Sequence, residues 1–175
     1  NVFIAPALVA ISMMTSSFFE CTYSSFVRMY YQKTFDAIIA TPLSLEEVIA
    51  GELLWGATKS LINSTIVLGV ISLLHLVSSP LIMLILPLSF LVGLLFSGIA
   101  MCFTAIVPNI DSFNYPSFLF ITPMFILSGT FFSITVLPVE VQAIANIFFP
   151  LTHAVALSRA FTVGRLSATL LLNLF

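Results

Sequence analysis

The sequence has very little charge. Only 7% of its 175 residues are charged, whereas 60% are hydrophobic and the mean hydropathy is +1.19. An ordinary globular chain is about a quarter charged. A water-soluble protein of this length could not cover its surface with five basic and seven acidic side chains, so we expect lipid to be its main solvent. The composition predicts an all-α, polytopic helical membrane protein, and the absence of a basic patch argues against a nucleic-acid partner.

Motifs of catalysis and nucleotide binding are also missing. The chain contains neither a phosphate-cradling P-loop nor a G-x-S-x-G nucleophile turn. Its two cysteines, Cys21 and Cys102, lie in different segments, which makes a disulfide or a metal site from them improbable. His75 and His153 have no third ligand at a suitable spacing. We therefore expect no metal and no bound cofactor, and if ATP drives this protein another chain must bind it.

Long uncharged runs predict the membrane spans. A helix needs about 20 apolar residues to cross a bilayer, and several segments reach or approach this length. The chain begins and stops within such runs, which we interpret as a fragment of a longer protein that forms one transmembrane domain over residues 1–175. The predicted spans cover residues 1–19, 53–77, 81–107 (kinked at Pro87), 117–137 (interrupted by Pro123 and Gly129) and the start of a last span at 167–175.

The segment 138–164 is uncharged at its centre but does not resemble a straight span. Pro150 interrupts it, and Glu140 and Arg159 bracket it closely. A broken backbone is tolerated at membrane depth only when protein or a wet cavity surrounds it. We therefore expect a re-entrant, extracytoplasmic segment of two short helices that meet near Pro150.

Most of the charge is concentrated in one region. Residues 20–60 hold Glu20, Arg28, Lys33, Asp36, Glu46, Glu47, Glu52 and Lys59. Basic residues favour the cytoplasmic side of a membrane, and Arg28, Lys33 and Lys59 on this side outnumber Arg159 and Arg165 on the other. We expect residues 20–52 to lie in the cytoplasm.

Residues 27–40 have the spacing of an amphipathic helix. Arg28, Gln32 and Asp36 recur every four residues, with Lys33 placed to pair with Asp36. Pro42 disfavours helical geometry at Thr41, so the helix should end there. The apolar stripe of the expected helix consists of Val27, Tyr31, Phe35 and Ile38.

A second helix should begin immediately afterwards. Ser44 and Glu47 have the S-x-x-E spacing of a capping box, and Glu46 adds a further negative charge to the first turn, where the helix dipole favours it. Together with Pro42, this cap would make the region a rigid lever.

Two roles for the amphipathic region remain open from the residues alone. It could lie on the membrane surface as an anchor, or it could dock to a soluble protein. Anchoring helices usually carry a basic polar face, whereas this one is mixed and is followed by an acidic turn. An acidic turn would be repelled by an anionic leaflet, which favours docking.

Three stretches carry a family resemblance. FVRMYYQKTFDAIIATPLSLEEVIAGELLWGATKSL, ITPMFILSGTFFSITVLP and FFPLTHAVALSRAFTVGR resemble, in register from residue 1 to about 167, the type-2 permeases of ATP-binding-cassette exporters. The nodulation-type lipo-oligosaccharide and polysaccharide exporters are the most similar subgroup. The chain departs from this six-span pattern because the first span is missing and the last is incomplete, and because Ser133 replaces a common proline.

The resemblance implies a permease subunit of the bacterial inner membrane that exports an amphipathic substrate such as a lipo-oligosaccharide, a polysaccharide or a drug. It implies a homodimer with a second permease copy and a cytoplasmic P-loop ATPase subunit that binds ATP and Mg²⁺ and performs the hydrolysis. The region that docks on the ATPase would be a coupling helix formed by Arg28, Tyr31, Gln32, Lys33, Asp36 and Thr41, with Pro42, Ser44, Glu46 and Glu47 as its cap and lever.

Other residues have weaker assignments. Phe131, Phe132, Pro150 and His153 are candidates for a substrate path or gate, although lipid contact or a structural role is the more ordinary use of such residues. Gly93 and Ser97 form a small-xxx-small pair that predicts close packing of helices within the chain.

Two other functions are less consistent with the sequence. An integral-membrane transferase could use Glu140 and His153 at the interface, but paired acid and base residues at one depth are not otherwise evident. A proton-coupled transporter would need carboxylates within its spans, and the predicted spans have none.

Overall fold

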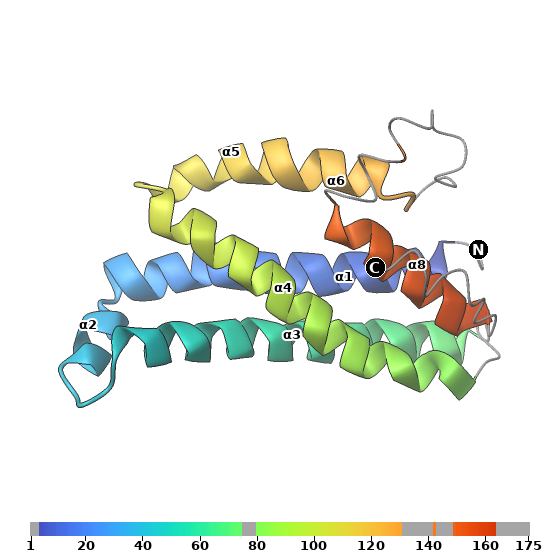
Figure 1. Cartoon of the computed structure of the whole chain (residues 1–175), viewed down its shortest axis with the longest axis horizontal. Coiled ribbons are helices and arrows are strands. Elements are labelled where there is room, and N and C mark those ends of the chain that lie inside the picture. Colours follow the sequence, from blue (N-terminus) through green and yellow to red (C-terminus); the bar gives the residue numbers. More distant parts are fainter. Residues whose placement is uncertain (1–3, 75–79, 131–141, 143–148, 164–175) are drawn as a thin grey trace.

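The computed structural model describes residues 4–74, 80–130, 142 and 149–163, and this part of the chain is all-α. Two long helices, α1 and α3, lie side by side along the long axis, and α4 packs against both while crossing them obliquely (Figure 1). The short helix α2 lies at one end of this bundle. The helical arm α5–α6 runs along it, and α8 packs against α1 towards the opposite end. Two helices, Leu45–Leu73 and Ile82–Ile106, are long and apolar enough to cross a membrane.

The first helix extends well beyond its predicted end at residue 19. α1 (Ala5–Phe19) continues into the π-helical segments η1 (Glu20–Ser24) and η2 (Val27–Tyr31), and Pro6 occupies the first turn, where its missing N–H costs nothing. A π turn bonds residue i to i+5 and so inserts an extra residue into the helix. Gln32 N–H donates to Val27 O at 2.9 Å in this way.

The helix predicted over residues 27–40 is wrong in one respect, because it is two pieces. Lys33 adopts a left-handed conformation with φ of 50° between η2 and α2 (Thr34–Ile39). The apolar stripe is therefore interrupted: Phe35 is buried, whereas Tyr31 is 67% exposed. The spacing of four indicated a helical face, but it did not reveal the turn at Lys33.

α3 (Leu45–Leu73) and α4 (Ile85–Ile106) form an antiparallel pair that packs closely. A Cβ on Gly93 would lie 2.5 Å from Ser60 Cβ, and a Cβ on Gly56 would lie 2.3 Å from Ser97 Oγ. Both distances are far below van der Waals contact, so a larger residue at either position would force neighbouring atoms to shift. The predicted packing role of Gly93 and Ser97 within the chain is confirmed.

Pro87 does not kink the middle of a span. It lies in the first turn of α4, just after the 3-10 segment η3 (Pro80–Leu84). A proline in the first turn removes no intrahelical hydrogen bond, and a 3-10 turn is a common start for an α-helix.

The arm returns from the charged end of the bundle. After the 3-10 segment η4 (Ile110–Phe113), it consists of α5 (Asn114–Pro116), η5 (Ser117–Ile121) and α6 (Thr122–Leu127). Gly129 ends it with a φ of 74°, a conformation that glycine adopts without strain. Ile121 and Met124 of the arm belong to the same hydrophobic core as Phe18 of α1 and Phe96 of α4.

α8 (Pro150–Val163) begins at the proline where the sequence predicted a break. Leu151 and Val155 face the core, and Arg159 Nη2 donates to Gly129 O at 2.6 Å. The C-terminal end of α6 is therefore held by a cation from α8, as the helix dipole favours. The first half of the re-entrant segment and the predicted last span lie outside the described residues.

Candidate functional site: the charged end of the bundle

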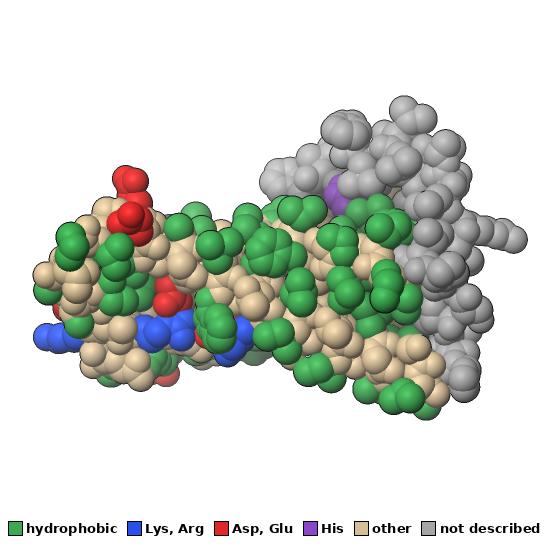
Figure 2. Space-filling model, turned by 90° about the horizontal axis from the view of Figure 1, so that it is seen from below, with side chains coloured by type: hydrophobic (Ala, Val, Ile, Leu, Met, Phe, Trp, Pro, Cys, Tyr) green, Lys and Arg blue, Asp and Glu red, His purple; other side chains and the backbone are tan. Residues whose placement is uncertain are grey.

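Charged side chains gather at one end of the molecule, over the region that links α1 to α3 (Figure 2). Four of them form a connected group, which we call the ion cluster: Glu20, Arg28, Glu52 and Lys59. Glu20 and Arg28 belong to the continuous helix formed by α1, η1 and η2, which we call the first helical rod. Glu52 and Lys59 lie in α3, between its third turn and its middle. The ion cluster therefore connects the first helical rod to α3 next to the exposed residues that link these two helices.

Arg28 bridges both carboxylates of the ion cluster. Its Nε donates to Glu52 Oε1 at 2.9 Å and its Nη2 donates to Glu52 Oε2, which is the two-point geometry that a planar guanidinium favours. A third nitrogen, Nη1, lies 3.3 Å from Glu20 Oε1. Ser25 Oγ also donates to Glu52 Oε2 at 2.6 Å. These contacts fix Arg28 inside the protein, with its side chain 25% exposed.

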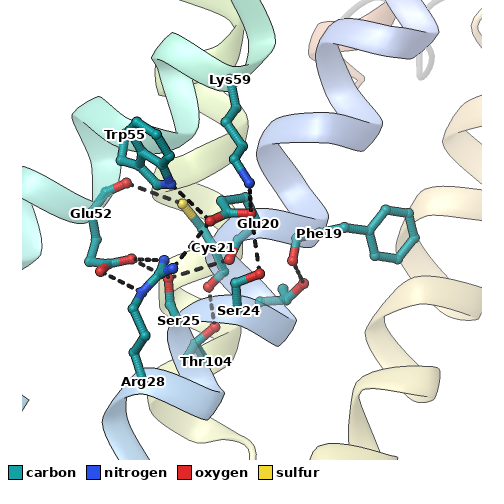
Figure 3. Close-up of polar contacts among 11 residues, drawn as sticks. Phe19, Glu20, Cys21, Ser24, Ser25, Arg28, Glu52, Trp55, Lys59 and Thr104 are labelled. Atoms are coloured by element: carbon teal, nitrogen blue, oxygen red, sulfur yellow. Dashed lines mark hydrogen bonds and ion pairs between the residues drawn. The ribbon is translucent and has the colours of Figure 1, made fainter. Parts of the chain in front are cut away.

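Glu20 is the most buried member of the ion cluster, with a side chain only 8% exposed. Lys59 Nζ donates to its Oε2 at 2.8 Å and Trp55 Nε1 donates to its Oε1 at 2.9 Å (Figure 3). Ser24 Oγ adds a hydrogen bond at 3.2 Å. The carboxylate oxygens are thus well supplied with donors, which a buried charge requires.

The environment shifts the ionisation of the ion cluster in a definite direction. Burial is the largest single effect and raises the pKa of Glu20, but the hydrogen bonds from Lys59, Trp55 and Arg28 together outweigh it and lower that pKa below its ordinary value. Burial likewise acts to lower the pKa of Arg28, while the bonds to Glu52 and Glu20 prevail and raise it. Glu20 and Arg28 are therefore both ionised at neutral pH.

Cys21 and Thr104 attach the ion cluster to the rest of the bundle. Thr104 Oγ1 of α4 donates to the carbonyl of Cys21 at 2.7 Å, and Cys21 Sγ lies 3.5 Å from the carbonyl of Glu52. Burial raises the pKa of the Cys21 thiol, which keeps it neutral. These contacts link α1, α3 and α4 directly beneath the charges.

The tip beyond the ion cluster is exposed. We define the docking tip as residues 30–47, which contain α2 and the turn into α3. Nearly all of the sequence-predicted partner-binding residues lie there with exposed side chains: Tyr31, Gln32, Lys33, Asp36, Thr41, Pro42, Ser44, Glu46 and Glu47. Arg28 differs from them, because its ion pairs point it into the protein.

The predicted pairing of Lys33 with Asp36 does not occur among the ion pairs of the described residues. Lys33 is the N-cap of α2 and has a left-handed backbone, whereas Asp36 lies in the first turn of α2 itself. Both side chains are therefore presented independently to the surroundings.

The capping box at the start of α3 is confirmed. Ser44 Oγ accepts from Glu47 N–H at 3.3 Å, and Glu47 Oε2 accepts from Ser44 N–H at 2.7 Å. Two N–H groups that a helix start leaves unpaired are satisfied in this way.

The other predicted site residues lie elsewhere. Pro150 and His153 are half-buried on α8, away from the ion cluster. Phe131 and Phe132, proposed for a substrate path, lie outside the described residues, as do Glu140 and His75. Glu20, Glu52 and Trp55 were not predicted as site residues, although an acidic residue at the end of an apolar run was a usable signal.

The amino-acid sequence is similar to proteins of a known family. The family model described as "ABC-2 type transporter" matches residues 1–162. The chain belongs to the ABC-2 type transporter family. Nodulation protein J of Sinorhizobium fredii is 35% identical over 163 residues, which covers 93% of this chain and 62% of that protein. Nodulation protein J of Rhizobium leguminosarum bv. viciae is 36% identical over 175 residues, covering 98% and 66%, and that of Rhizobium meliloti is 36% identical, covering 93% and 62%.

The chain thus spans somewhat under two thirds of the length of these relatives. No solved structure shows a significant match to it. Membership of the ABC-2 family confirms the predicted resemblance to nodulation-type permeases and the all-α membrane fold. It also makes the chain a membrane component of a transporter rather than an enzyme, which decides against the transferase alternative at Glu140 and His153.

Proposed function

We propose that this chain is the permease subunit of an ATP-driven exporter of the bacterial inner membrane. In this proposal the docking tip lies in the cytoplasm and binds a separate P-loop ATPase subunit, which carries the ATP and Mg²⁺. A second copy of the permease completes the assembly. The substrate is an amphipathic molecule such as a lipo-oligosaccharide, a polysaccharide or a drug, consistent with the subgroup that the sequence resembles.

One observation supports this mechanism above all. Arg28, in η2 just before the docking tip, is bonded both to Glu20, where α1 passes into η1, and to Glu52 in α3. A push on the tip is therefore passed to two predicted spans at once. Flexible attachment would dissipate such a movement, whereas a hydrogen-bonded ionic cluster in a partly buried setting resists it.

The proposed cycle is mechanical. ATP binding brings the two ATPase subunits together, the docking tips move with them, and the ion cluster carries the movement into α1 and α3. The spans then rock to open a path outward. Pro150 and His153 on α8, with Phe131 and Phe132, remain our proposed residues for that path.

The proposal can be tested by recovering the partner from membranes. A tagged, full-length permease should co-purify with a P-loop ATPase subunit. The charge reversals Lys33→Glu and Asp36→Lys, combined in one variant, should lower that recovery because both side chains are exposed on the tip. Asp111→Asn is the control, since Asp111 is exposed on η4, which contacts η1 near the ion cluster, but lies outside the tip.

Normal amounts of the double variant in the membrane are expected, because neither side chain supports the fold through an ion pair. Undiminished ATPase recovery with the double variant would count against docking through this tip. Equal loss with Asp111→Asn would mean that the effect is not specific to it.

A further inference from the structure

Phe113 is fully buried although it belongs to the short connection after α4. Its neighbours Asp111, Asn114 and Tyr115 are all exposed, as is usual for a connection at the end of a bundle. The ring of Phe113 lies 5.3 Å from that of Phe26 at 87°, an edge-to-face arrangement. The connection after α4 therefore buries one large side chain against Phe26, close to the start of the docking tip.

Tyr23 is a second aromatic neighbour of Phe113. The ring of Tyr23 lies 5.2 Å away, at 50°. Tyr23 and Phe26 lie on successive turns of the first helical rod, on either side of Ser24 and Ser25. Aromatic contacts of this kind depend steeply on distance and orientation, so a shift of the rod here must move the Phe113 ring as well.

The aromatic contacts also reach outward to the docking tip. Phe26 packs against Tyr30 with 4.5 Å between ring centres, and against Tyr31 at 6.2 Å. Tyr30 and Tyr31 are 52% and 67% exposed. An unbroken series of rings thus runs from the exposed tip to Phe113.

Phe113 in turn begins a long arm. From Phe113 the chain passes through α5, η5 and α6 without an intervening loop and reaches Gly129, whose carbonyl accepts from Arg159 of α8 (Figure 1). The arm is therefore fixed at its far end to α8 and at its near end to the rod. Phe120 of the arm also contacts Phe103 of α4, at 5.9 Å between ring centres.

We propose that Phe113 is a positioning residue that transmits movement of the docking tip to the arm formed by α5, η5 and α6. This inference rests on the proposed function, since it assumes that a partner moves the tip. The ion cluster links the tip to α3, and Phe113 provides a separate, uncharged link to the arm. The two links act on different helices, so one can be lost while the other persists.

The test compares two positions in the full-length protein bound to its ATPase subunit. In a Cys102→Ser background, which removes an exposed thiol and keeps the buried Cys21, single cysteines are placed by Gln32→Cys on the tip and Tyr115→Cys on the arm. Maleimide labelling rates are measured in membrane vesicles without nucleotide and with MgATP plus vanadate. We expect nucleotide-dependent rates at both positions.

Phe113→Ala should abolish the nucleotide dependence at position 115 and leave it intact at position 32. Phe118→Ala is the matched control, because Phe118 lies on the same arm but is 73% exposed; it should change neither rate. Should Phe113→Ala fail to accumulate in the membrane, Phe113→Leu keeps most of the buried volume without the ring, and a diminished response at position 115 is expected.

The outcomes separate the two proposals. A full response at position 115 in either Phe113 variant overturns the role of Phe113. A parent protein that responds at position 32 but not at position 115 also overturns it, while the proposed function stands. A parent protein with no response at position 32 contradicts the proposed function itself, and the inference with it.

Discussion

Arg28 and Glu52 are 24 residues apart in the sequence, yet they form a two-point ion pair that joins the end of the first helical rod to the beginning of α3. In the proposed mechanism this ion pair must stay intact while movement passes from the docking tip to the spans. Its contribution should be visible first in stability.

Replacing Arg28 should destabilise the fold. Arg28→Ala leaves Glu52 and Glu20 without their shared cation, and the loss should be about 2 kcal/mol, between the values of exposed and fully buried pairs. Arg28→Lys keeps the charge but loses the two-point geometry and should lose less. Thermal unfolding in detergent measures both variants. Identical unfolding midpoints for the parent protein and Arg28→Ala would show that the ion pair does not stabilise the fold.

The lowered pKa of Glu20 predicts how stability depends on acid. A carboxyl group whose pKa is lower in the folded state stabilises the fold above its unfolded-state pKa, and this contribution is lost as the pH falls through the folded value. The loss should therefore appear below about pH 4.3, the ordinary value for Glu. Glu20→Gln should flatten the pH dependence of the unfolding temperature in that range. An unchanged pH dependence in Glu20→Gln would contradict this role of Glu20.

The cap of α3 should govern local opening at the docking tip. Ser44→Ala removes the acceptor of the Glu47 N–H and should cost about 1 kcal/mol of helix stability. Hydrogen exchange should accelerate over the first turn of α3, at residues 45–48, and should remain unchanged in the middle of α3. Glu46→Ala serves as the comparison, because Glu46 shares the turn but not the capping box. Equal acceleration in both variants would argue that the box is not the cause.

The close packing of α3 on α4 gives a prediction whose control residue lies on the same helix, α4. Gly93→Ala would place a Cβ 3.0 Å from Ala57 Cα as well as against Ser60, so backbone must shift, at a cost of about 1–3 kcal/mol. A Cβ on Gly98 meets nothing within 4 Å, so Gly98→Ala should be neutral or slightly stabilising. Equal decreases in the unfolding temperatures of the two variants would contradict the close approach of α3 and α4 at Gly93.

The features that could be predicted from the sequence are those that depend on neighbouring residues. The all-α class followed from uncharged runs, and the capping box and the small pair at Gly93 and Ser97 each follow from a spacing of three or four. Such spacings are fixed by the helix itself. They hold whatever the rest of the chain does.

The ion cluster could not be predicted in the same way. Its members lie between Glu20 and Lys59, and the π-helical segment η1 changes the helical register between Glu20 and Arg28. A period of 3.6 residues therefore places Arg28 on the wrong face. For the same reason Arg28 appeared to belong to the partner-binding surface, whereas its side chain is bonded within the protein. The burial of Phe113 against Tyr23 and Phe26 also depends on packing between residues far apart in the sequence, which no local pattern encodes.

The most direct test of the central claim places a photo-crosslinking amino acid at Gln32 of the full-length protein in its native membrane. Gln32 is exposed on the docking tip, and Leu73, 80% exposed at the opposite end of α3, is the control position. The account predicts that a P-loop ATPase is captured from position 32 and not from position 73. Repeated failure to capture it from position 32, or its capture from position 73 instead, would contradict the account.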